Sequence, residues 1–234
     1  MHAPWTFVDL WGKSGKFDVI VPYAHLDGRA LVAGLPAERK VSGLVDPLFR
    51  LSVNFYGAPA LSMKEFTAYR QDLVVGASVQ VSAPVGQYDS SKLVNLVTNR
   101  WSVKPDIGFS KLFGAFMLDF SAGLSFYTDN NEFAGGQSRK QDPIYSAQAN
   151  LSYSFGRGAW ASLGVTEYRG GQTTVNGVRK DDELSNSRLG AILALPIDRY
   201  DSIKFNFSSG ISTRIGTSFD TFGIAWQYRW GEGF

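Results

Sequence analysis

The sequence predicts an all-β fold, a transmembrane antiparallel β-barrel, and three observations lead to this prediction. Long stretches alternate large apolar residues with polar or small ones, which is typical of strands with one face in lipid and one in water. The connections between these stretches alternate between short turns and longer polar loops. The chain ends in an aromatic strand whose outward residues are in phase with the terminal Phe234. Composition favours a single barrel domain over residues 1–234.

About eleven strands are predicted. They are residues 5–11, 16–23, 49–55, 73–85, 101–109, 116–126, 145–155, 161–170, 189–195, 203–211 and 221–230. The short turns are 12–15, 111–114, 156–158 and 198–201, and the long polar loops with which they alternate are 24–43, 87–100, 128–142 and 171–185. Residues 57–71 depart from this rule, since they are long but lie on the short side, and a short connection at 216–220 leads to the last strand. Such an asymmetry is typical of a barrel with periplasmic turns and extracellular loops.

The first two strands are predicted to form a hairpin because residues 12–15 read Gly-Lys-Ser-Gly between them. Residues 24–43 lose the alternation, and they are expected to form a loop. Residues 57–71 are expected to contain a short helix, since Ser62 and Glu65 have the spacing of a capping box.

The following strands show the alternation most cleanly, and 73–85 exceeds the roughly 9–11 residues that a tilted strand needs to cross a bilayer. A slip of one residue would exchange the two faces, so the pattern makes a sharp prediction. The residues expected to face lipid include Val79, Val81, Phe116, Leu118, Phe120, Phe205 and Phe207.

The C-terminal part combines a hairpin signal with the aromatic strand. Asn176-Gly177 lies between Val175 and Val178, which predicts a two-residue turn and an extended ribbon within 171–185. The residues expected to face the membrane, and to form the signal by which the barrel-assembly machinery recognises the last strand, are Trp226, Tyr228, Trp230 and Phe234.

The odd strand number has a consequence for completeness. A bacterial single-chain barrel normally has an even number of strands with both ends in the periplasm. We therefore expect at least one further N-terminal strand, for a total of about twelve or alternatively fourteen, and an open seam between the first and last strands. The start of the chain also lacks the pattern of a signal peptide, so either it has been removed or the chain is a fragment.

Composition excludes several classes. No 18-residue apolar segment exists, which excludes a transmembrane helix. The absence of Cys excludes disulfides, cysteine zinc sites and thiol nucleophiles. Net charge is +2 with scattered Lys and Arg, so no nucleic-acid partner is expected.

Charged residues in the inward phase are the candidate functional groups. They either form a selectivity path across the lumen or pair with one another to stabilise a filled barrel, and both alternatives stay open. The candidate channel-lining residues are Arg50, Lys104, Asp106, Asp119, Arg188, Lys204, Arg214 and Arg229. Asp18 and Asp72 have the same phase. Arg188 and Arg214 lie near polar loops and are the better candidates for first contact with a ligand.

Catalytic and metal-binding signals are weak. His25, in a predicted loop near Asp27, is the one candidate base besides the terminal His2, and such a residue is usually solvated. Asp181, Asp182 and Glu183 offer hard oxygen ligands for Ca²⁺ but lack the spacing of a calcium loop. We expect no enzyme activity and no cofactor.

Several short motifs also resemble one family. They are residues 87–89 (Gln-Tyr-Asp), 98–102 (Thr-Asn-Arg-Trp-Ser), 141–143 (Gln-Asp-Pro), 185–188 (Ser-Asn-Ser-Arg), 212–216 (Ser-Thr-Arg-Ile-Gly) and 226–230 (Trp-Gln-Tyr-Arg-Trp). From about Gly12 to the C-terminus the chain resembles the transporter family named after the meta-cleavage pathway of phenol degradation. The resemblance implies an outer-membrane barrel with further N-terminal sequence and a link to the breakdown of aromatic compounds. It implies no catalytic or binding residues.

These observations predict a channel in the bacterial outer membrane for passive uptake of small, hydrophobic or aromatic compounds. Its expected partners are membrane lipid, the small-molecule solute and the barrel-assembly machinery. The alternatives are an outer-membrane hydrolase and a structural or adhesive barrel with a plugged lumen.

Overall fold

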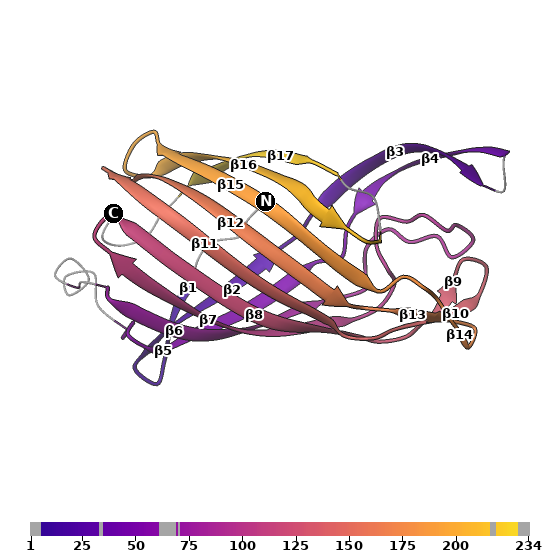
Figure 1. The fold of residues 1–234 in the computed structure, drawn as a ribbon, viewed down its shortest axis with the longest axis horizontal. Coiled ribbons are helices and arrows are strands. Elements are labelled where there is room, and N and C mark those ends of the chain that lie inside the picture. The colour runs from indigo at the N-terminus through magenta and orange to yellow at the C-terminus, as the bar shows by residue number, and fades with distance from the viewer. Residues whose placement is uncertain (1–5, 33–34, 61–68, 70, 216–218, 229–234) are drawn as a thin grey trace.

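The structure, a computed structural model, describes residues 6–32, 35–60, 69, 71–215 and 219–228 (Figure 1). The strands are β1 (Thr6–Leu10), β2 (Lys13–Ile20), β3 (Tyr23–Val32), β4 (Leu35–Leu44), β5 (Leu48–Tyr56), β6 (Leu73–Ser82), β7 (Ser102–Phe113), β8 (Phe116–Tyr127), β9 (Asn130–Phe133), β10 (Gln137–Gln141), β11 (Ile144–Gly156), β12 (Ala159–Gly170), β13 (Thr173–Val175), β14 (Val178–Arg179), β15 (Leu184–Pro196), β16 (Asp201–Thr213) and β17 (Thr221–Tyr228). Among the described residues, no helix has the length and apolar character needed to cross a membrane.

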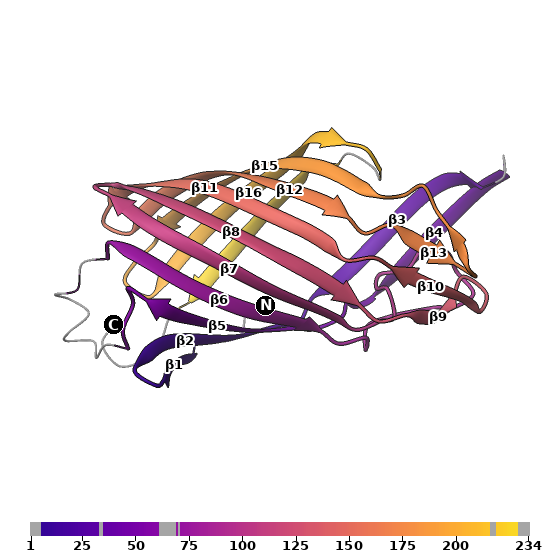
Figure 2. The same cartoon turned by 60° about the horizontal axis from the view of Figure 1, so that its bottom comes forward.

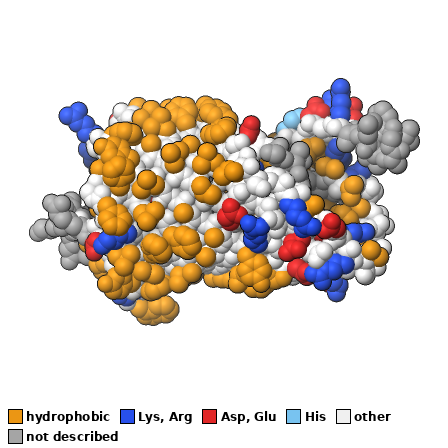
Figure 3. Space-filling model, in the orientation of Figure 1, with side chains coloured by type: hydrophobic (Ala, Val, Ile, Leu, Met, Phe, Trp, Pro, Cys, Tyr) orange, Lys and Arg blue, Asp and Glu red, His pale blue; other side chains and the backbone are white. Residues whose placement is uncertain are grey.

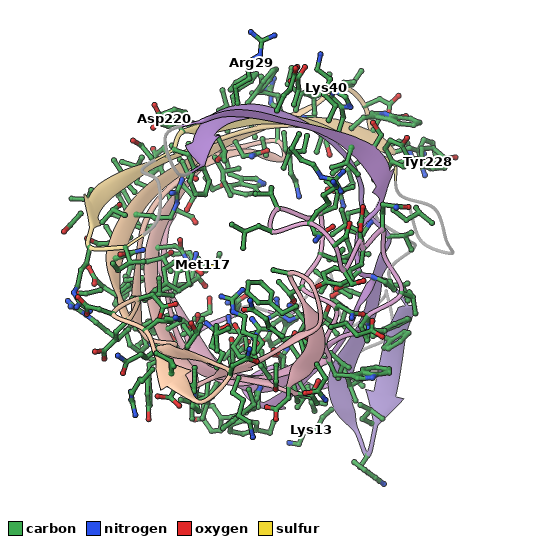
Figure 4. All side chains as sticks on the ribbon, turned by 90° about the vertical axis from the view of Figure 1, so that its right-hand side faces the viewer. Lys13, Arg29, Lys40, Met117, Asp220 and Tyr228 are labelled. Atoms are coloured by element: carbon green, nitrogen blue, oxygen red, sulfur yellow. The ribbon has the colours of Figure 1, made fainter. Side chains whose placement is uncertain are left out.

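Eleven strands form one sheet in the order β1-β2-β5-β6-β7-β8-β11-β12-β15-β16-β17. All neighbours are antiparallel, and each strand pairs with the wall strands before and after it in the chain. The sheet is tilted and curls around a central opening, which Figure 4 shows from one end. The predicted all-β barrel architecture and its eleven strands are confirmed.

The two edges of this sheet are β1 and β17. Among the described residues, β1 pairs only with β2 and β17 pairs only with β16. Backbone N–H and C=O groups at an open edge have no partners in lipid, where each costs several kcal/mol. The further N-terminal strand that would close the barrel stays a prediction.

Apolar side chains cover the outer face of the sheet. Exposed fractions of 44% for Val79, 46% for Phe116 and 40% for Phe120 place the predicted lipid-facing residues on the surface, and the Phe109 and Phe120 rings stack there at 5.6 Å. Figure 3 shows this apolar band over most of the wall, with charged side chains gathered toward one end. In a water-soluble sheet these residues would be buried, so the pattern indicates a wall built for lipid.

Exposed aromatic residues lie near both borders of the apolar band. Those close to the short turns include Phe113, Phe116, Phe155, Trp226 and Tyr228. Those close to the long connections include Tyr23, Phe49, Trp101, Phe126, Tyr145 and Phe222. Aromatic girdles at the two membrane interfaces have this arrangement. We call the two ends of the barrel the turn end and the loop end.

The largest difference from the sequence prediction concerns residues 24–43, because the expected loop is instead the hairpin of β3 and β4. The two strands pair continuously from Tyr23 and Leu44 to Val32 and Leu35. Figure 2 shows the hairpin projecting beyond the barrel wall at the loop end. In β3, Ala24, Leu26 and Gly28 are half-buried and alternate with exposed charged or polar residues, but two of the three are small, so the apolar signal is too weak to identify a strand.

Other connections at the loop end are also more ordered than expected. Residues 128–142 contain β9 and β10, and the strands β14-β13-β10-β9 form a second sheet there. The predicted turn at Asn176-Gly177 is confirmed, with Val175 opposite Val178 and positive φ angles of 49° and 79°. These angles fit a type I′ turn, for which Asn-Gly is the preferred sequence.

Two short turns differ by a few residues from the prediction. The first turn is Trp11-Gly12 rather than 12–15. Lys13 is already the first residue of β2, and it pairs with Leu10 of β1. The second lies after Phe113 rather than at 111–114, since Phe113 pairs with Phe116. In both cases ladder pairing continues to the residue next to the turn, and such strand ends are the part of an element that a sequence pattern locates least accurately. The helix expected over 57–71 lies largely outside the described residues.

Candidate functional site: the inner wall and the loop end

The inner face of the sheet is lined by small and polar side chains. Along β11 this face carries Ser146, Gln148, Asn150, Ser152 and Ser154. Several inner residues are exposed to the central opening, among them Gln148 and Asn206. In Figure 4 the opening is seen end-on, with Met117 of β8 labelled on the wall. The inner face therefore suits water and polar groups.

Glycine recurs on the inner face directly opposite larger polar residues of the next strand. Asn54 pairs with Gly76, and Asn206 pairs with Gly223. A Cβ built on Gly76 would lie 2.6 Å from the Asn54 Oδ1, and one on Gly223 would lie 2.7 Å from the Asn206 amide. Each amide side chain thus lies against its glycine neighbour along the wall.

The same arrangement recurs in two further places. Asp106 lies opposite Gly123, and Asn150 lies opposite Gly164. The four pairs thus lie at four separate places on the wall, on β5–β6, β7–β8, β11–β12 and β16–β17. The sequence alternation predicted small inner residues but not that each glycine would accommodate a specific cross-strand neighbour.

A charged recess of about 240 Å³ lies on the inner wall between β5 and β8. It brings together three of the predicted channel-lining residues, Arg50, Asp106 and Asp119. Arg50 Nη2 is 3.5 Å from Asp106 Oδ1, and Ser78 joins them by donating its hydroxyl to Asp106 Oδ1 at 2.8 Å and accepting from Arg50 Nε at 3.1 Å. This part of the wall therefore contains a paired cation and anion beside a second carboxylate.

The remaining predicted charges are placed differently. Lys204 Nζ lies 5.7 Å from the centre of the Trp160 ring on the inner face. Lys104 of β7 pairs with Gln80, in the same inward phase as Asp106. Asp18 forms an ion pair of 2.8 Å with Lys16, a lumen cation that the sequence analysis missed.

Asp72 does not line the lumen as predicted. It precedes β6 and forms an ion pair with Lys111 at the turn end, so strand alternation does not extend to it. Arg229, Trp230 and Phe234 lie outside the described residues. Trp226 and Tyr228 are on the outer face, with 69% and 47% exposure, and Trp226 Nε1 donates to Asp201 Oδ1 at 2.6 Å.

The two arginines expected near the loops have different environments. Arg188 Nη2 donates to Ser208 Oγ and to the Phe219 carbonyl, each at 2.9 Å, and its guanidinium lies 4.1 Å from the centre of the Phe219 ring. Arg214 instead binds the acidic loop, at 2.5 Å to Asp181 Oδ1 and 2.9 Å to the Glu183 carbonyl. Of these two arginines, Arg188 is the one that lies over an aromatic ring among the described residues.

The acidic loop is held by protein contacts. Asp182 accepts hydrogen bonds from the Thr173 backbone N at 2.7 Å and from Thr173 Oγ1 at 2.5 Å, while Arg214 contacts Asp181 and lies 4.0 Å from Glu183. The described residues contain no group of three or more His, Cys, Asp or Glu side chains that could hold a metal ion. Each of the three acidic side chains thus has a partner within the protein.

His25 lies on the projecting hairpin, where its Nδ1 is 2.6 Å from Ser42 Oγ. Asp27, the neighbouring carboxylate, is 3.4 Å from Lys40 Nζ rather than beside the imidazole. The His25 side chain is exposed. A Ser–His pair on an exposed ribbon lacks both an orienting carboxylate and a pocket that excludes water.

The loop end has a compact interior of its own. Residues 83–101, which we call the mouth loop, pack under β9, and Val97 and Asn130 are buried. Asn130 Nδ2 donates to Tyr88 OH and to the Thr98 carbonyl, both at 3.0 Å. Asp46 accepts from Gly86 N at 2.9 Å, and burial raises the pKa of this carboxyl above its ordinary value despite hydrogen bonds from Gly86 and Val85.

A cluster of aromatic and cationic residues lies at the base of the mouth loop. Arg100 is only 6% exposed, and its guanidinium lies 4.3 Å from the centre of the Tyr127 ring while Nη2 donates to Gln141 Oε1. Arg139 stacks over Phe133 at 5.0 Å. We call Arg100, Tyr127, Phe133, Arg139 and Gln141 the mouth cluster. In the sequence, Arg100 and Gln141 belong to two separate family motifs, and no pattern there predicts that they meet.

Comparisons with known proteins agree with this architecture. The family model described as "Putative MetA-pathway of phenol degradation" matches residues 5–228. Nineteen chains of solved structures match, and one is the crystal structure of an outer membrane channel from Pseudomonas putida F1. That structure is 19% identical, with a TM-score of 0.75, and the alignment covers 92% of this chain and 76% of that chain. No curated protein matches the sequence significantly.

Proposed function

The chain belongs to the family described by its link to phenol degradation, and from that premise we propose that it is an outer-membrane channel for passive uptake of small aromatic or hydrophobic compounds. The loop end faces the outside of the cell and the turn end faces the periplasm. Transport needs no cofactor, and the protein is not an enzyme.

The observation that carries this proposal is the inner wall of polar residues lying over glycines. These glycines let polar side chains lie along the wall, whereas a barrel stabilised only by its filling would direct them toward the centre. The recess with Arg50, Asp106 and Asp119 gives the wall both signs of charge, as pores use ionisable groups along their path. Arg188 with Phe219 supplies an aromatic and cationic contact near the outer end.

A pair of variants on β11 tests the proposal. Gln148 faces the opening and Ala149 faces the membrane, and both are exposed. We expect Gln148→Trp to reduce the flux of phenol into proteoliposomes because the indole obstructs the lumen, while Ala149→Trp leaves it unchanged. Heat-modifiable migration on gels would verify that both variants are folded. Channel function would be refuted if phenol flux were the same for the unchanged protein and both variants, and no higher than the flux into liposomes without protein.

A further inference from the structure

The mouth cluster contains cationic donors that the protein itself leaves unpaired. Among the described residues, Nε and Nη1 of Arg100 and Nε of Arg139 are buried and have no hydrogen-bond acceptor. Burying a charged group without an acceptor costs much more than exposing it, so such groups are normally paired. Three unpaired guanidinium donors in one cluster are therefore an exception that calls for a ligand.

The charge of the cluster points in the same direction. Burial and the like charge of Arg139 lower the pKa of Arg100 to about 10, so Arg100 remains a cation at neutral pH. The two like charges repel each other, and each guanidinium lies over an aromatic ring, Tyr127 for Arg100 and Phe133 for Arg139. A monoanion between them would remove the repulsion and supply the missing acceptors.

Nearby carboxylates are engaged elsewhere. Glu132 accepts from Asn99, Asp129 pairs with Lys140 at 3.1 Å, and Asp142 pairs with Arg179 at 2.9 Å. Within the part of the chain that the structure describes, neither Arg100 nor Arg139 has a carboxylate within ion-pair distance. The protein thus provides two cations without their counter-anion.

We propose that Arg100 and Arg139 form an anion-binding site at the outer mouth that takes the carboxylate of a small aromatic acid. The carboxylate accepts from the unpaired guanidinium donors, and its aromatic ring lies against Tyr127 and Phe133. This inference rests on the proposed function, since it names aromatic acids as a class of transported solute. The site would be met first on the path from the outside, before the recess of the inner wall.

The test uses the intact protein in detergent, with benzoate as the probe and benzyl alcohol as a neutral compound of similar size. We expect saturable binding of benzoate by titration calorimetry, a higher thermal midpoint in benzoate, and neither effect with benzyl alcohol. Arg100→Gln and Arg139→Gln should each weaken benzoate binding about tenfold or more, because each removes charge-assisted hydrogen bonds. Arg139 is the less buried of the two, so its variant remains informative if Arg100→Gln does not fold.

Arg169→Gln is the matched control, since Arg169 is exposed and pairs with Glu167; it should bind benzoate as the unchanged protein does. Absent benzoate binding, or equal binding by the Arg139→Gln variant, would overturn the site. A chloride control tests the assignment to a carboxylate. The assignment would be overturned if chloride raised the thermal midpoint and, at a concentration equal to that of benzoate, abolished the rise caused by benzoate.

Flux measurements separate this proposal from the channel proposal. Phenol flux with no benzoate binding would leave the channel intact and remove the site. Benzoate binding without flux of either solute would retain the site as a ligand-binding site and remove the transport function.

Discussion

The barrel wall and the loop end of this protein are built on opposite physical principles. The wall exposes its apolar residues, such as Leu163 at 61%. The loop end buries Val97 together with polar groups such as Asn130, as a water-soluble domain does. The wall therefore relies on backbone ladders and surrounding lipid, whereas the loop end relies on a network of specific side-chain contacts.

The largest expected effect comes from placing a charge on the outer wall. Leu163 lies near the middle of β12, between Leu151 and Ala191. We expect Leu163→Arg to destabilise the folded protein in lipid by about 2–4 kcal/mol, because the guanidinium would lie in hydrocarbon. Urea unfolding in lipid vesicles, followed by tryptophan fluorescence, measures the loss.

Gln148→Arg is the control for this change, since Gln148 is exposed on the inner face. It should cost far less than Leu163→Arg because water solvates the new charge. Similar losses for both variants would contradict the assignment of the two faces.

A smaller and local effect is expected at the loop end. Asn130→Ala removes the donors to Tyr88 and Thr98 and the acceptor for Glu132 N at 2.9 Å. Loss of these buried contacts should cost about 1–3 kcal/mol and open the mouth loop without unfolding the wall. Hydrogen exchange should rise in residues 83–101 only.

The neighbouring Asn131→Ala serves for comparison, because Asn131 is exposed and accepts one hydrogen bond from Ser138 Oγ. Faster exchange throughout β7 and β8 in the Asn130 variant would show that wall and loop end unfold together.

The two outer arginines should differ in function. Arg188→Ala removes the guanidinium that lies over Phe219 and that we expect to contact the ring of the solute. Phenol flux should fall severalfold, because a cation–π contact with the solute would contribute about 0.5–2 kcal/mol. Arg214→Ala should leave flux unchanged and instead increase proteolysis of the acidic loop, because Arg214 holds Asp181. The reverse assignment of these two phenotypes would mean that Arg214 contacts the solute.

The smallest effect concerns pH at the loop end. The raised pKa of Asp46 means that the folded mouth binds this proton more tightly than the unfolded chain. Local stability should therefore rise as pH falls from neutral through the raised pKa toward the ordinary value of 3.8, and level off below it. Hydrogen exchange of the mouth loop between these pH values measures this slope.

Asp46→Asn imitates the protonated form and can still accept from Gly86 N through its amide oxygen. This variant should have a flatter pH dependence than the unchanged protein. An identical slope in both proteins would assign the pH response to another group.

Sequence alone determined the barrel wall. A strand between lipid and water has one apolar and one polar face, and this requirement acts at every second residue, so the register of Phe116 to Phe126 could be read directly. The local turn at Asn176-Gly177 was also predictable, since it depends on two adjacent residues.

Tertiary structure alone decided the loop end and the partners of the inner charges. The β3–β4 hairpin, the pairing of Asp72 with Lys111, the contacts of Arg214 with the acidic loop and the meeting of Arg100 with Arg139 join residues that no periodic pattern links. Arg100 and Arg139 come from different connections, and only the folding of the mouth loop under β9 brings them together. Alternation reports which solvent a residue faces, but it carries no information about which distant side chain completes its hydrogen bonds.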